Sequence, residues 1–501
     1  MSGRRRSDAG AAPRRQCLLD AEVAFGRRPQ AAGEMGAAVV YPHTYRVGMA
    51  GLGYQLVAGM FAAHGAFRAE RYFAAYEGRP APTTVAPVGL EYGTPLGAQQ
   101  LIAVAAYYEP DYLNILRMLN AAGVRLWTAE RGEFEPLVFL GGPAVTANAE
   151  PMAPFADAVF LGDVEESLPR ALDIVAARWG ARRRELWEAL AAVPGVYVPA
   201  LYRVVLGRPG GERRVADADG RPWPALAWLP DLTPYRGASW WATPYAEFGK
   251  LMLVEPIRGC GRGCHFCETP LISPPRRRDL ASLAALLDEA AAAGVRKVGL
   301  VGAALADYDG IVSLIEDILA RGMTFSVSSL ALGAPATRAI IAALGKGGQR
   351  SVTLAPEGAT PAARRRWGKP AAEGVLEDTL AAAAAAGLSR VKLYYLVGGE
   401  GEADEDVAAI GRELAALTRR FRRLNGEARV NALVPKPGTR CAGVPLLLRP
   451  EYRRRLKLIR REAGRAAVVA GSWREAAFQA RVGAADRSAA RWLERAAANG
   501  A

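Results

Sequence analysis

Residues 255–267 read Glu-Pro-Ile-Arg-Gly-Cys-Gly-Arg-Gly-Cys-His-Phe-Cys and hold three of the five cysteines in a chain of 501 residues. The apolar run 251–254 directly precedes this stretch and predicts a buried strand. Three glycines around the cysteines allow a tight loop, so we expect the thiolates of Cys260, Cys264 and Cys267 to converge on one point. Because thiolates favour soft metals, the stretch predicts a metal centre.

Two kinds of metal centre fit these ligands. A Cys₃His zinc site would add His265, but zinc sites usually take ligands from two separate segments, and Cys17 and Cys441 are isolated. His265 also directly follows Cys264, which is poor geometry for a tetrahedron. A 4Fe–4S cluster with only three protein thiolates would keep one iron open to an outside ligand. We favour the cluster over zinc because of these missing zinc ligands. We favour it over a chance group of buried cysteines because the loop is polar and glycine-rich.

The Cys-x₃-Cys-x₂-Cys spacing after the first strand of an α/β unit, with Phe266 before the last cysteine, resembles the signature of radical S-adenosylmethionine (SAM) enzymes. The resemblance implies that Cys260, Cys264 and Cys267 hold a 4Fe–4S cluster whose open iron chelates the amino and carboxylate groups of SAM. It also implies that reductive cleavage of SAM yields a 5′-deoxyadenosyl radical that abstracts hydrogen, with an electron from a flavodoxin- or ferredoxin-type protein.

Length and composition limit the class of protein. The length suggests two to four domains, and 51% hydrophobic residues are ample for their cores. No uninterrupted apolar run is long enough to span a membrane. We expect residues 1–35 to be a disordered basic tail without an apolar signal core, on a cytoplasmic protein. The few, clustered cysteines also fit a reducing compartment.

The net charge of +14 invites a nucleic-acid interpretation. Arginine runs stand at residues 276–278, 364–366, 419–423 and 453–455. No basic–aromatic repeat and no known nucleic-acid module accompanies them. We therefore favour a solvated, arginine-rich surface and keep nucleic-acid binding as the less favoured alternative.

Residues 36–175 predict a parallel, doubly wound sheet of Rossmann type, because apolar strands alternate with helical patterns. The strands are expected at 37–41, 101–105, 137–140 and 158–161, and helices at about 52–64 and 110–122. Ligands of such sheets lie at the carboxyl ends of the strands, where Gly141-Gly142 and Gly162 stand. Tight strand-to-loop turns explain the same glycines equally well.

This arrangement resembles the cobalamin-binding domain that precedes the radical domain in one large class of radical SAM enzymes. The Asp-x-His-x-x-Gly motif of that domain is absent, since His43 follows Tyr41-Pro42 and His64 follows two alanines. The resemblance therefore implies a corrinoid held without a histidine ligand, or else a relic or a substrate-recognition module. Recurring phrases of one uncharacterised branch, Ala69-Glu70-Arg71 among them, extend the resemblance over most of residues 37–501.

Residues 250–447 predict a partial (β/α)₆ barrel of TIM type, because six strand–helix units follow one another from the cysteine strand. The later strands are expected at 297–301, 324–329, 351–355, 391–397 and 430–434. Residues 176–249 are expected to connect the two domains, with a hairpin around 207–220. Residues 448–501 are expected to form a helical, amphipathic extension.

Active residues of parallel barrels gather at the carboxyl ends of the strands. Beside the aromatic Phe266, the resemblance to radical SAM enzymes implies SAM contacts at four such ends: the Gly302 backbone near the methionine amino group, Ser328 near the ribose or carboxylate, Glu357 on a ribose or an ammonium, and Gly398 near the adenine. It also implies that Lys392, on the fifth strand, meets the SAM carboxylate. A solvent-facing lysine explains Lys392 as well.

Three classes of function stay open. The first is a corrinoid-dependent methyl transfer or rearrangement on a small molecule. The second is modification of a tRNA or a protein, since residues 434–439 resemble a segment of methylthiotransferases, although there is no second cysteine triad for an auxiliary cluster. The third is a non-catalytic iron–sulfur sensor or scaffold. Nothing in these residues specifies the substrate.

Overall fold

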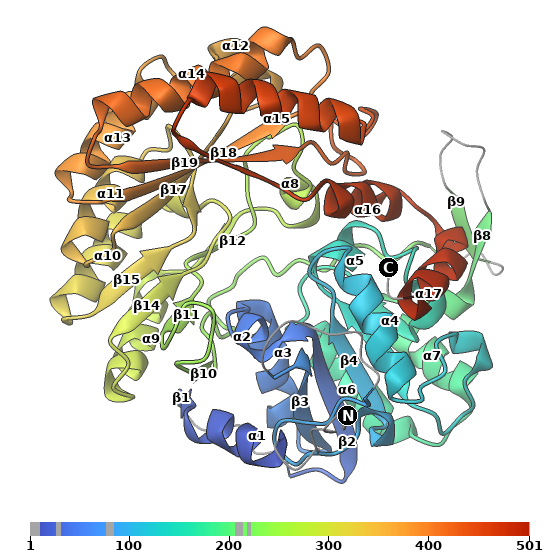
Figure 1. The fold of residues 1–501 in the computed structure, drawn as a ribbon. Coiled ribbons are helices and arrows are strands. Elements are labelled where there is room, and N and C mark those ends of the chain that lie inside the picture. The colour runs from blue at the N-terminus through green and yellow to red at the C-terminus, as the bar shows by residue number, and fades with distance from the viewer. Residues whose placement is uncertain (1–10, 27–31, 77–84, 206–213, 218–221, 500–501) are drawn as a thin grey trace, which may run out of the picture. The chain divides into compact units, whose positions relative to one another are not determined.

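The computed structural model describes residues 11–26, 32–76, 85–205, 214–217 and 222–499, which form two compact units (Figure 1). The first unit comprises residues 1–229, 238–252 and 485–501, and the second comprises residues 230–237 and 253–484. The hairpin expected around 207–220 is present as an antiparallel pair of β8 (Tyr202–Val205) and β9 (Arg214–Asp217), and most of its expected turn lies outside the described residues.

The first unit is built on a six-stranded sheet in the order β3-β2-β4-β5-β6-β7. The strands are β2 (Met35–Thr44), β3 (Phe67–Ala75), β4 (Leu101–Ala105), β5 (Leu137–Gly141), β6 (Ala158–Phe160) and β7 (Val196–Tyr197). All pairs are parallel except the edge pair of β6 and β7. The Rossmann-type prediction is confirmed, and β3 and β7 add to the strands that were expected.

The central strands of this sheet are apolar throughout because both of their faces are covered. Residues 101–104 and 137–140 are buried. The helices of this unit include α3 (Leu52–Ala63), α4 (Asp111–Ala121), α6 (Ser167–Arg178), α7 (Arg183–Ala191) and α17 (Ala490–Ala498). Helix α17 packs on α4, and Arg117 of α4 donates to the carbonyl of Ala497, so residues from both ends of the sequence belong to this unit.

The prediction of a disordered tail over residues 1–35 is wrong for residues 11–26. They form helix α1 (Ala11–Asp20) and the short strand β1 (Val23–Ala24), which pairs with β10 (Trp241–Ala242). Leu18 and Phe25 are buried. The first fifteen residues are rich in arginine, but apolar side chains of the following segment are buried in the core of the first unit.

The second unit carries two sheets, β11-β14-β15 and β16-β17-β18-β19-β20. Their strands are β11 (Met252–Val254), β14 (Lys297–Leu300), β15 (Thr324–Val327), β16 (Ser329–Leu330), β17 (Ser351–Glu357), β18 (Arg390–Val397), β19 (Asn425–Ala432) and β20 (Ala467–Ala470). Ser328 alone separates β15 from β16. The strands thus follow one another as in a partial TIM-type barrel, and this prediction is confirmed.

Helices line the outer side of these strands (Figure 1). They are α9 (Leu280–Ala292), α10 (Ile311–Ala320), α11 (Thr337–Lys346), α13 (Val375–Ala385) and α14 (Asp404–Arg420). In β18 the buried residues alternate with half-buried ones, and the buried Tyr395 donates its hydroxyl to Glu413 of α14. The buried set therefore faces the helices, and Lys392, Tyr394 and Leu396 lie on the inner face.

The expectation that residues 448–501 are helical is wrong for residues 467–470. Between α15 (Arg449–Ala463) and α16 (Trp473–Gly483), strand β20 adds a seventh strand position to the barrel and pairs in parallel with β19. Strand β19 also begins at Asn425, earlier than expected. Both segments were overlooked because one is very short and the other carries polar side chains on its inner face.

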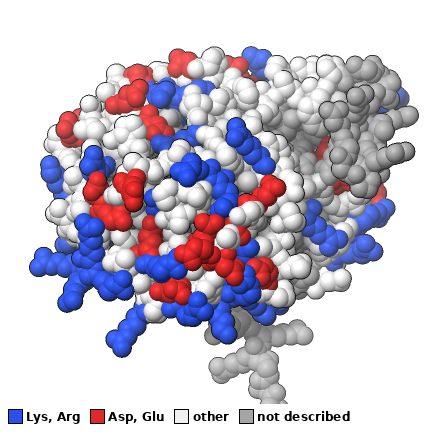
Figure 2. Space-filling model, turned by 90° about the horizontal axis from the view of Figure 1, so that it is seen from above, with Lys and Arg blue, Asp and Glu red and all other residues white. Residues whose placement is uncertain are grey.

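Charges of both signs are mixed on the surface. Figure 2 shows Lys and Arg interspersed with Asp and Glu on one face of the molecule. Arg454, for example, pairs with both Asp404 and Glu451. Such pairing supports the solvated surface rather than a continuous basic patch. Among the described residues no helix is long and apolar enough to cross a membrane.

We expect the free energy of unfolding of the first unit to depend strongly on Asp157. Its buried carboxylate binds Arg131 at 2.9 Å and Arg183 at 2.8 Å, and these charges hold the pKa of Asp157 low against the effect of burial. Asp157→Ala leaves two buried guanidinium groups without their partner and should cost about 3–5 kcal/mol in urea unfolding. Glu188→Ala, which removes an exposed pair with Arg184, is the control and should cost less than about 1 kcal/mol. Equal losses would contradict the assignment.

Candidate functional site

The cysteine loop leaves the barrel after β12 (Ile257–Arg258) and returns through β13 (Arg276–Arg277), and these two strands pair antiparallel at its base. Cys260 donates its N–H to the carbonyl of Ser273 at 3.2 Å. Gly259 has a φ of +76°, and a Cβ there would overlap the carbonyl of Pro274. A glycine is therefore required where the loop begins.

His265 holds the far side of the loop and is not available as a metal ligand. Its Nδ1 lies 2.9 Å from the carbonyl of Arg366, and its Nε2 lies 3.1 Å from Arg440 Nη1. Its backbone N–H donates to Trp367, and its carbonyl accepts from Cys441. With both ring nitrogens engaged, the Cys₃His zinc alternative loses its fourth ligand.

We expected the three cysteines to converge on a single point, but they do not. Among the described residues, no three His, Cys, Asp or Glu side chains are arranged to hold one metal ion. A 4Fe–4S cluster requires cysteine side chains that are further apart than around a single ion, because each thiolate binds a different iron of the cluster. The donor set of this loop therefore fits a cluster better than a single ion.

The sulfur atoms share one electrostatic environment. Burial raises the pKa of the Cys260 and Cys264 thiols, and the charge of Cys267 raises both further. The N–H of Arg262 lies 3.4 Å from Cys260 Sγ and acts in the opposite direction, as does Lys369 on Cys264. These positive groups would stabilise thiolates once the cysteines bind iron.

Arg262 is itself fixed, because its Nε lies 2.7 Å from Asp307 Oδ2. Asp307 belongs to the short 3₁₀ helix Leu305–Asp307 that follows β14. The second strand–helix unit of the barrel thus positions a cation on the cysteine loop, although the sequence did not single out either residue.

Glu357, which the sequence analysis proposed as a site residue, ends β17 in a strained conformation. Its φ of +60° makes it the one non-glycine residue with positive φ in the part of the chain that the structure describes. It is buried, burial raises its pKa, and its Oε1 lies 2.8 Å from Lys369 Nζ. Such strain costs about 1–3 kcal/mol and tends to occur at functional sites.

Lys369 connects Glu357 to the cysteine loop. Its Nζ lies 5.5 Å from the centre of the Phe266 ring, which also meets Trp367 edge-on at 6.1 Å. Lys369 and Glu357 both act on the pKa of Cys264. The structure thus brings two of the proposed cofactor contacts, Phe266 and Glu357, to the cysteines, with Lys369 as a residue that the sequence analysis missed.

A cavity of about 290 Å³ opens beside Phe266. It lies at the carboxyl ends of β18 and β19, where α16 begins. Its lining combines apolar residues, Phe266, Leu396, Leu433, Val434 and Ala476, with polar residues, Asn431, Lys436, Glu475 and Gln479. Apolar walls with a few polar groups are typical of small-molecule sites.

Gly302 and Ser328 lie at the strand ends where they were expected. A Cβ at Gly302 would overlap Ile257 of β12, so this glycine allows the second strand to pack against the start of the cysteine loop. Ser328 is exposed between β15 and β16. Their SAM contacts remain proposals.

The positions of Lys392 and Gly398 are less favourable for the SAM contacts proposed for them. Lys392 is the third residue of β18, four residues before Leu396, which places it about 13 Å along the strand from the cavity. It faces the inner side opposite Thr353 and Glu427. Gly398 donates its N–H to Glu402 at 2.6 Å, and a Cβ there would meet Leu447. Their SAM contacts, like those of Gly302 and Ser328, remain proposals.

In the first unit, the strand-end glycines serve tight turns. Gly142 and Gly162 have φ values of +118° and +96°. A Cβ at Gly142 would overlap the carbonyl of Ala106, and one at Gly162 would overlap that of Ala227. Close backbone packing is sufficient to explain both residues.

The strand order of this sheet instead indicates a ligand position at the carboxyl ends of β2 and β4. The topological switch point lies here, because β3 is added on one side of β2 and β4 on the other. Tyr41 and Tyr107 lie here with ring centres 5.5 Å apart, and Tyr107 accepts the N–H of Tyr54 at 2.8 Å. Asp111 follows, and burial raises its pKa to about 7. His43 is at the same edge, whereas His64 stands before β3 at the opposite end of the strands.

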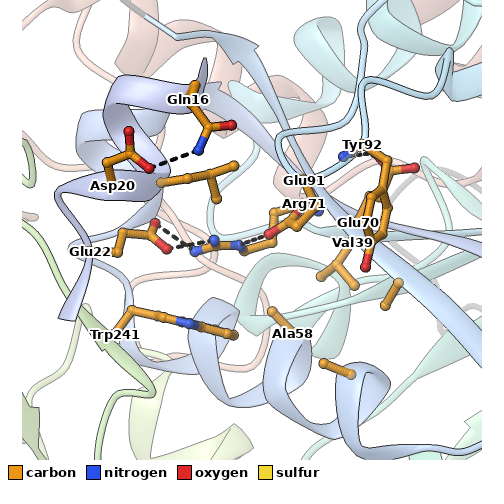
Figure 3. A pocket seen from close by; sticks show the side chains of 13 residues that line it. Gln16, Asp20, Glu22, Val39, Ala58, Glu70, Arg71, Glu91, Tyr92 and Trp241 are labelled. Atoms are coloured by element: carbon orange, nitrogen blue, oxygen red, sulfur yellow. Dashed lines mark hydrogen bonds and ion pairs between the residues drawn. The ribbon is translucent and has the colours of Figure 1, made fainter. Parts of the chain in front are cut away.

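A second cavity, of about 540 Å³, lies between α1, α3 and β3 (Figure 3). Figure 3 shows Arg71 between Glu22 and Glu91, to which it binds at 2.7 and 2.6 Å. Glu70 accepts from the N–H of Tyr92 and from Gln99. The charged groups of this cavity are thus satisfied within the protein, and they anchor the N-terminal segment.

Residues 254–414 match the model of the radical SAM superfamily, and residues 53–199 match that of the N-terminal domain of radical SAM proteins. The chain is a radical SAM protein. It is an enzyme of the class that uses a 4Fe–4S cluster and SAM, and this class requires a reductant. The sensor or scaffold alternative is therefore set aside.

Relatives of this radical SAM enzyme extend over both units. An uncharacterised protein, MJ0966 of Methanocaldococcus jannaschii, is 27% identical over 406 residues, which are 80% of this chain and 78% of that protein. The radical SAM methyltransferase TsrM of Kitasatospora setae, solved with cobalamin and a 4Fe–4S cluster bound, is 15% identical with a TM-score of 0.51 and covers 82% of this chain and 74% of its own. TsrM shares the fold. The cobalamin-dependent radical enzyme OxsB, solved with aqua-cobalamin, gives 12% identity, coverage of 76% and 52%, and a TM-score of 0.47.

The contacts of His265 predict that it contributes to the shape of the loop and not to metal binding. His265→Ala in the radical SAM enzyme should therefore retain about four irons after anaerobic reconstitution, since a cluster of that size is held by the cysteines. The measurement is iron and sulfide content, with wild-type protein beside it. Loss of half or more of the iron, with zinc bound instead, would restore the zinc alternative.

Proposed function

We propose that this enzyme cleaves SAM reductively at a 4Fe–4S cluster held by Cys260, Cys264 and Cys267. The observation that carries the proposal is the position of one cysteine loop beside both a buried Glu357–Lys369 pair and a cavity bounded by Phe266. When bound, the cluster supplies the electron and the open iron at which SAM gives a 5′-deoxyadenosyl radical and methionine.

The residues around the loop prepare this site. Arg262 and Lys369 offset the negative charge of the thiolates. Glu357, held beside Lys369 by a strained backbone, is placed to accept a hydrogen bond from the ribose or ammonium of SAM. The cavity beside Phe266 is lined by apolar and polar side chains together, which suits the nucleoside part of SAM.

The partner that supplies the electron is, in this proposal, a flavodoxin- or ferredoxin-type protein. Free cysteines without disulfides among the described residues agree with a cytoplasmic, reducing environment, which an oxygen-sensitive cluster requires. Mixed charges in Figure 2 and the pairing of Arg454 give no support to a nucleic-acid partner. A small molecule is therefore the proposed substrate class, with a tRNA or protein as the alternative.

Replacing Cys260, Cys264 and Cys267 together by alanine should abolish the brown chromophore and the release of 5′-deoxyadenosine under strong reductant, since no thiolate remains for any iron. Cys441→Ala is the matched control, because Cys441 is buried beside the loop without being part of the triad. It should retain iron and SAM cleavage. Stoichiometric zinc in anaerobically purified wild-type protein, with no iron uptake, would refute the proposal.

A second candidate function is methyl transfer through a corrinoid bound to the first unit. The fold shared with TsrM over most of the chain supports it, together with the strand order, which puts the switch point of the sheet between β2 and β4. Tyr41, Tyr107 and Asp111 lie at this switch point and would supply the polar contacts to the corrinoid. His43 Nδ1 accepts the N–H of Thr44 at 2.9 Å. We propose a corrinoid without a histidine ligand because the sequence lacks the Asp-x-His-x-x-Gly motif.

Anaerobic incubation with hydroxocobalamin, followed by desalting, tests this second function. We expect near-stoichiometric corrinoid to stay bound and its cob(II)alamin electron paramagnetic resonance spectrum to lack nitrogen superhyperfine splitting. His43→Ala should leave both results unchanged. Splitting that disappears in this variant would show that His43 is a ligand. Absence of bound corrinoid would remove methyl transfer through cobalt and leave hydrogen abstraction.

A further inference from the structure

The polar side chains that line the 290 Å³ cavity come from a part of the chain beyond the matched radical SAM domain, which ends at residue 414. Glu475 and Gln479 are four residues apart on α16 and therefore lie on one face of that helix. Asn431 joins them from the inner face of β19. Within the described part of the chain, none of these three side chains has a hydrogen-bonding or ionic partner.

The position of the third polar group, the side-chain amide of Asn431, depends on Gly471. It lies between β20 and α16, and a Cβ there would overlap Oδ1 of Asn431. The Asn431 amide thus lies against the backbone of residue 471, which the absence of a side chain permits. Phe266 and Leu396 line the same cavity, and Leu396 pairs with Asn431 across β18 and β19, so the cavity offers a ring both apolar surface and polar atoms.

We propose that α16 acts as a specificity element of this enzyme, in which Glu475 and Gln479, with Asn431, recognise the amino edge of the adenine of SAM. The inference rests on the proposed function. An adenine presents an amino donor beside a ring-nitrogen acceptor. The Glu475 carboxylate accepts from the amino group, and the side-chain amides of Gln479 and Asn431 supply the complementary donor. A hypoxanthine presents an oxygen in place of the amino group, and that oxygen faces a carboxylate.

The test measures binding of S-adenosylhomocysteine and of its deaminated analogue, S-inosylhomocysteine, to the anaerobically reconstituted enzyme by equilibrium dialysis. Wild-type enzyme should bind the adenosyl compound at least about tenfold more tightly, the value of one hydrogen bond to a charged group. Glu475→Gln should lose most of this preference, because an amide can also donate to the oxygen of hypoxanthine.

Two further variants separate recognition from a general loss of structure. Gly471→Ala displaces the Asn431 amide and should weaken adenosyl binding with unchanged iron content and thermal stability. Arg474→Ala alters an exposed neighbour on α16 and should leave both affinities unchanged. Equal binding of the two compounds by wild-type enzyme, or an unchanged preference in Glu475→Gln, would overturn the inference alone. Failure of the wild-type enzyme to bind either compound would overturn the proposed function as well.

Discussion

The cysteine loop has almost no regular structure of its own, and the site depends on how its backbone is held. Besides Ser273 within the loop itself, its hydrogen-bond partners include Trp367 and Cys441, far along the chain. These two belong to different strand–helix connections of the barrel. The positions of the thiols are thus fixed by the partial barrel of parallel strands at whose carboxyl ends the loop lies. The strain at Glu357 is tolerated for the same reason, since the neighbouring strands determine its backbone.

Much of this architecture follows from the sequence because buried parallel strands leave a simple pattern. Residues 101–105 and 391–397 are apolar or alternate regularly, and both were placed to within a residue. The cysteine triad is equally plain, since three thiols within eight positions have few explanations. Phe266 and Glu357 were identified through the resemblance, and the structure adds the contact with Lys369 that joins them.

Other structural features depend on contacts between residues that are distant in the sequence, and these contacts are seen only in the structure. Strand β20 is only four residues long, and its strand character comes from pairing with β19. Lys392 was assigned a SAM contact by analogy, and its distance from the cavity follows only from the parallel register, which puts it opposite Thr353. The glycines at positions 142 and 162 could be assigned to turns only when Ala106 and Ala227 were seen against them. Glu475 and Gln479 carry no signal until α16 is seen beside the cavity.

The division of the chain has a consequence for the order of assembly during synthesis. The first unit includes residues 485–501, and Arg487 there binds Glu150 at 2.8 Å. All residues of the second unit, up to 484, leave the ribosome before these. Domains generally fold as units as they emerge, the N-terminal one first. Here the part that begins first is completed last, so the barrel with its cysteine loop is able to close on a nascent chain whose first unit still lacks α17.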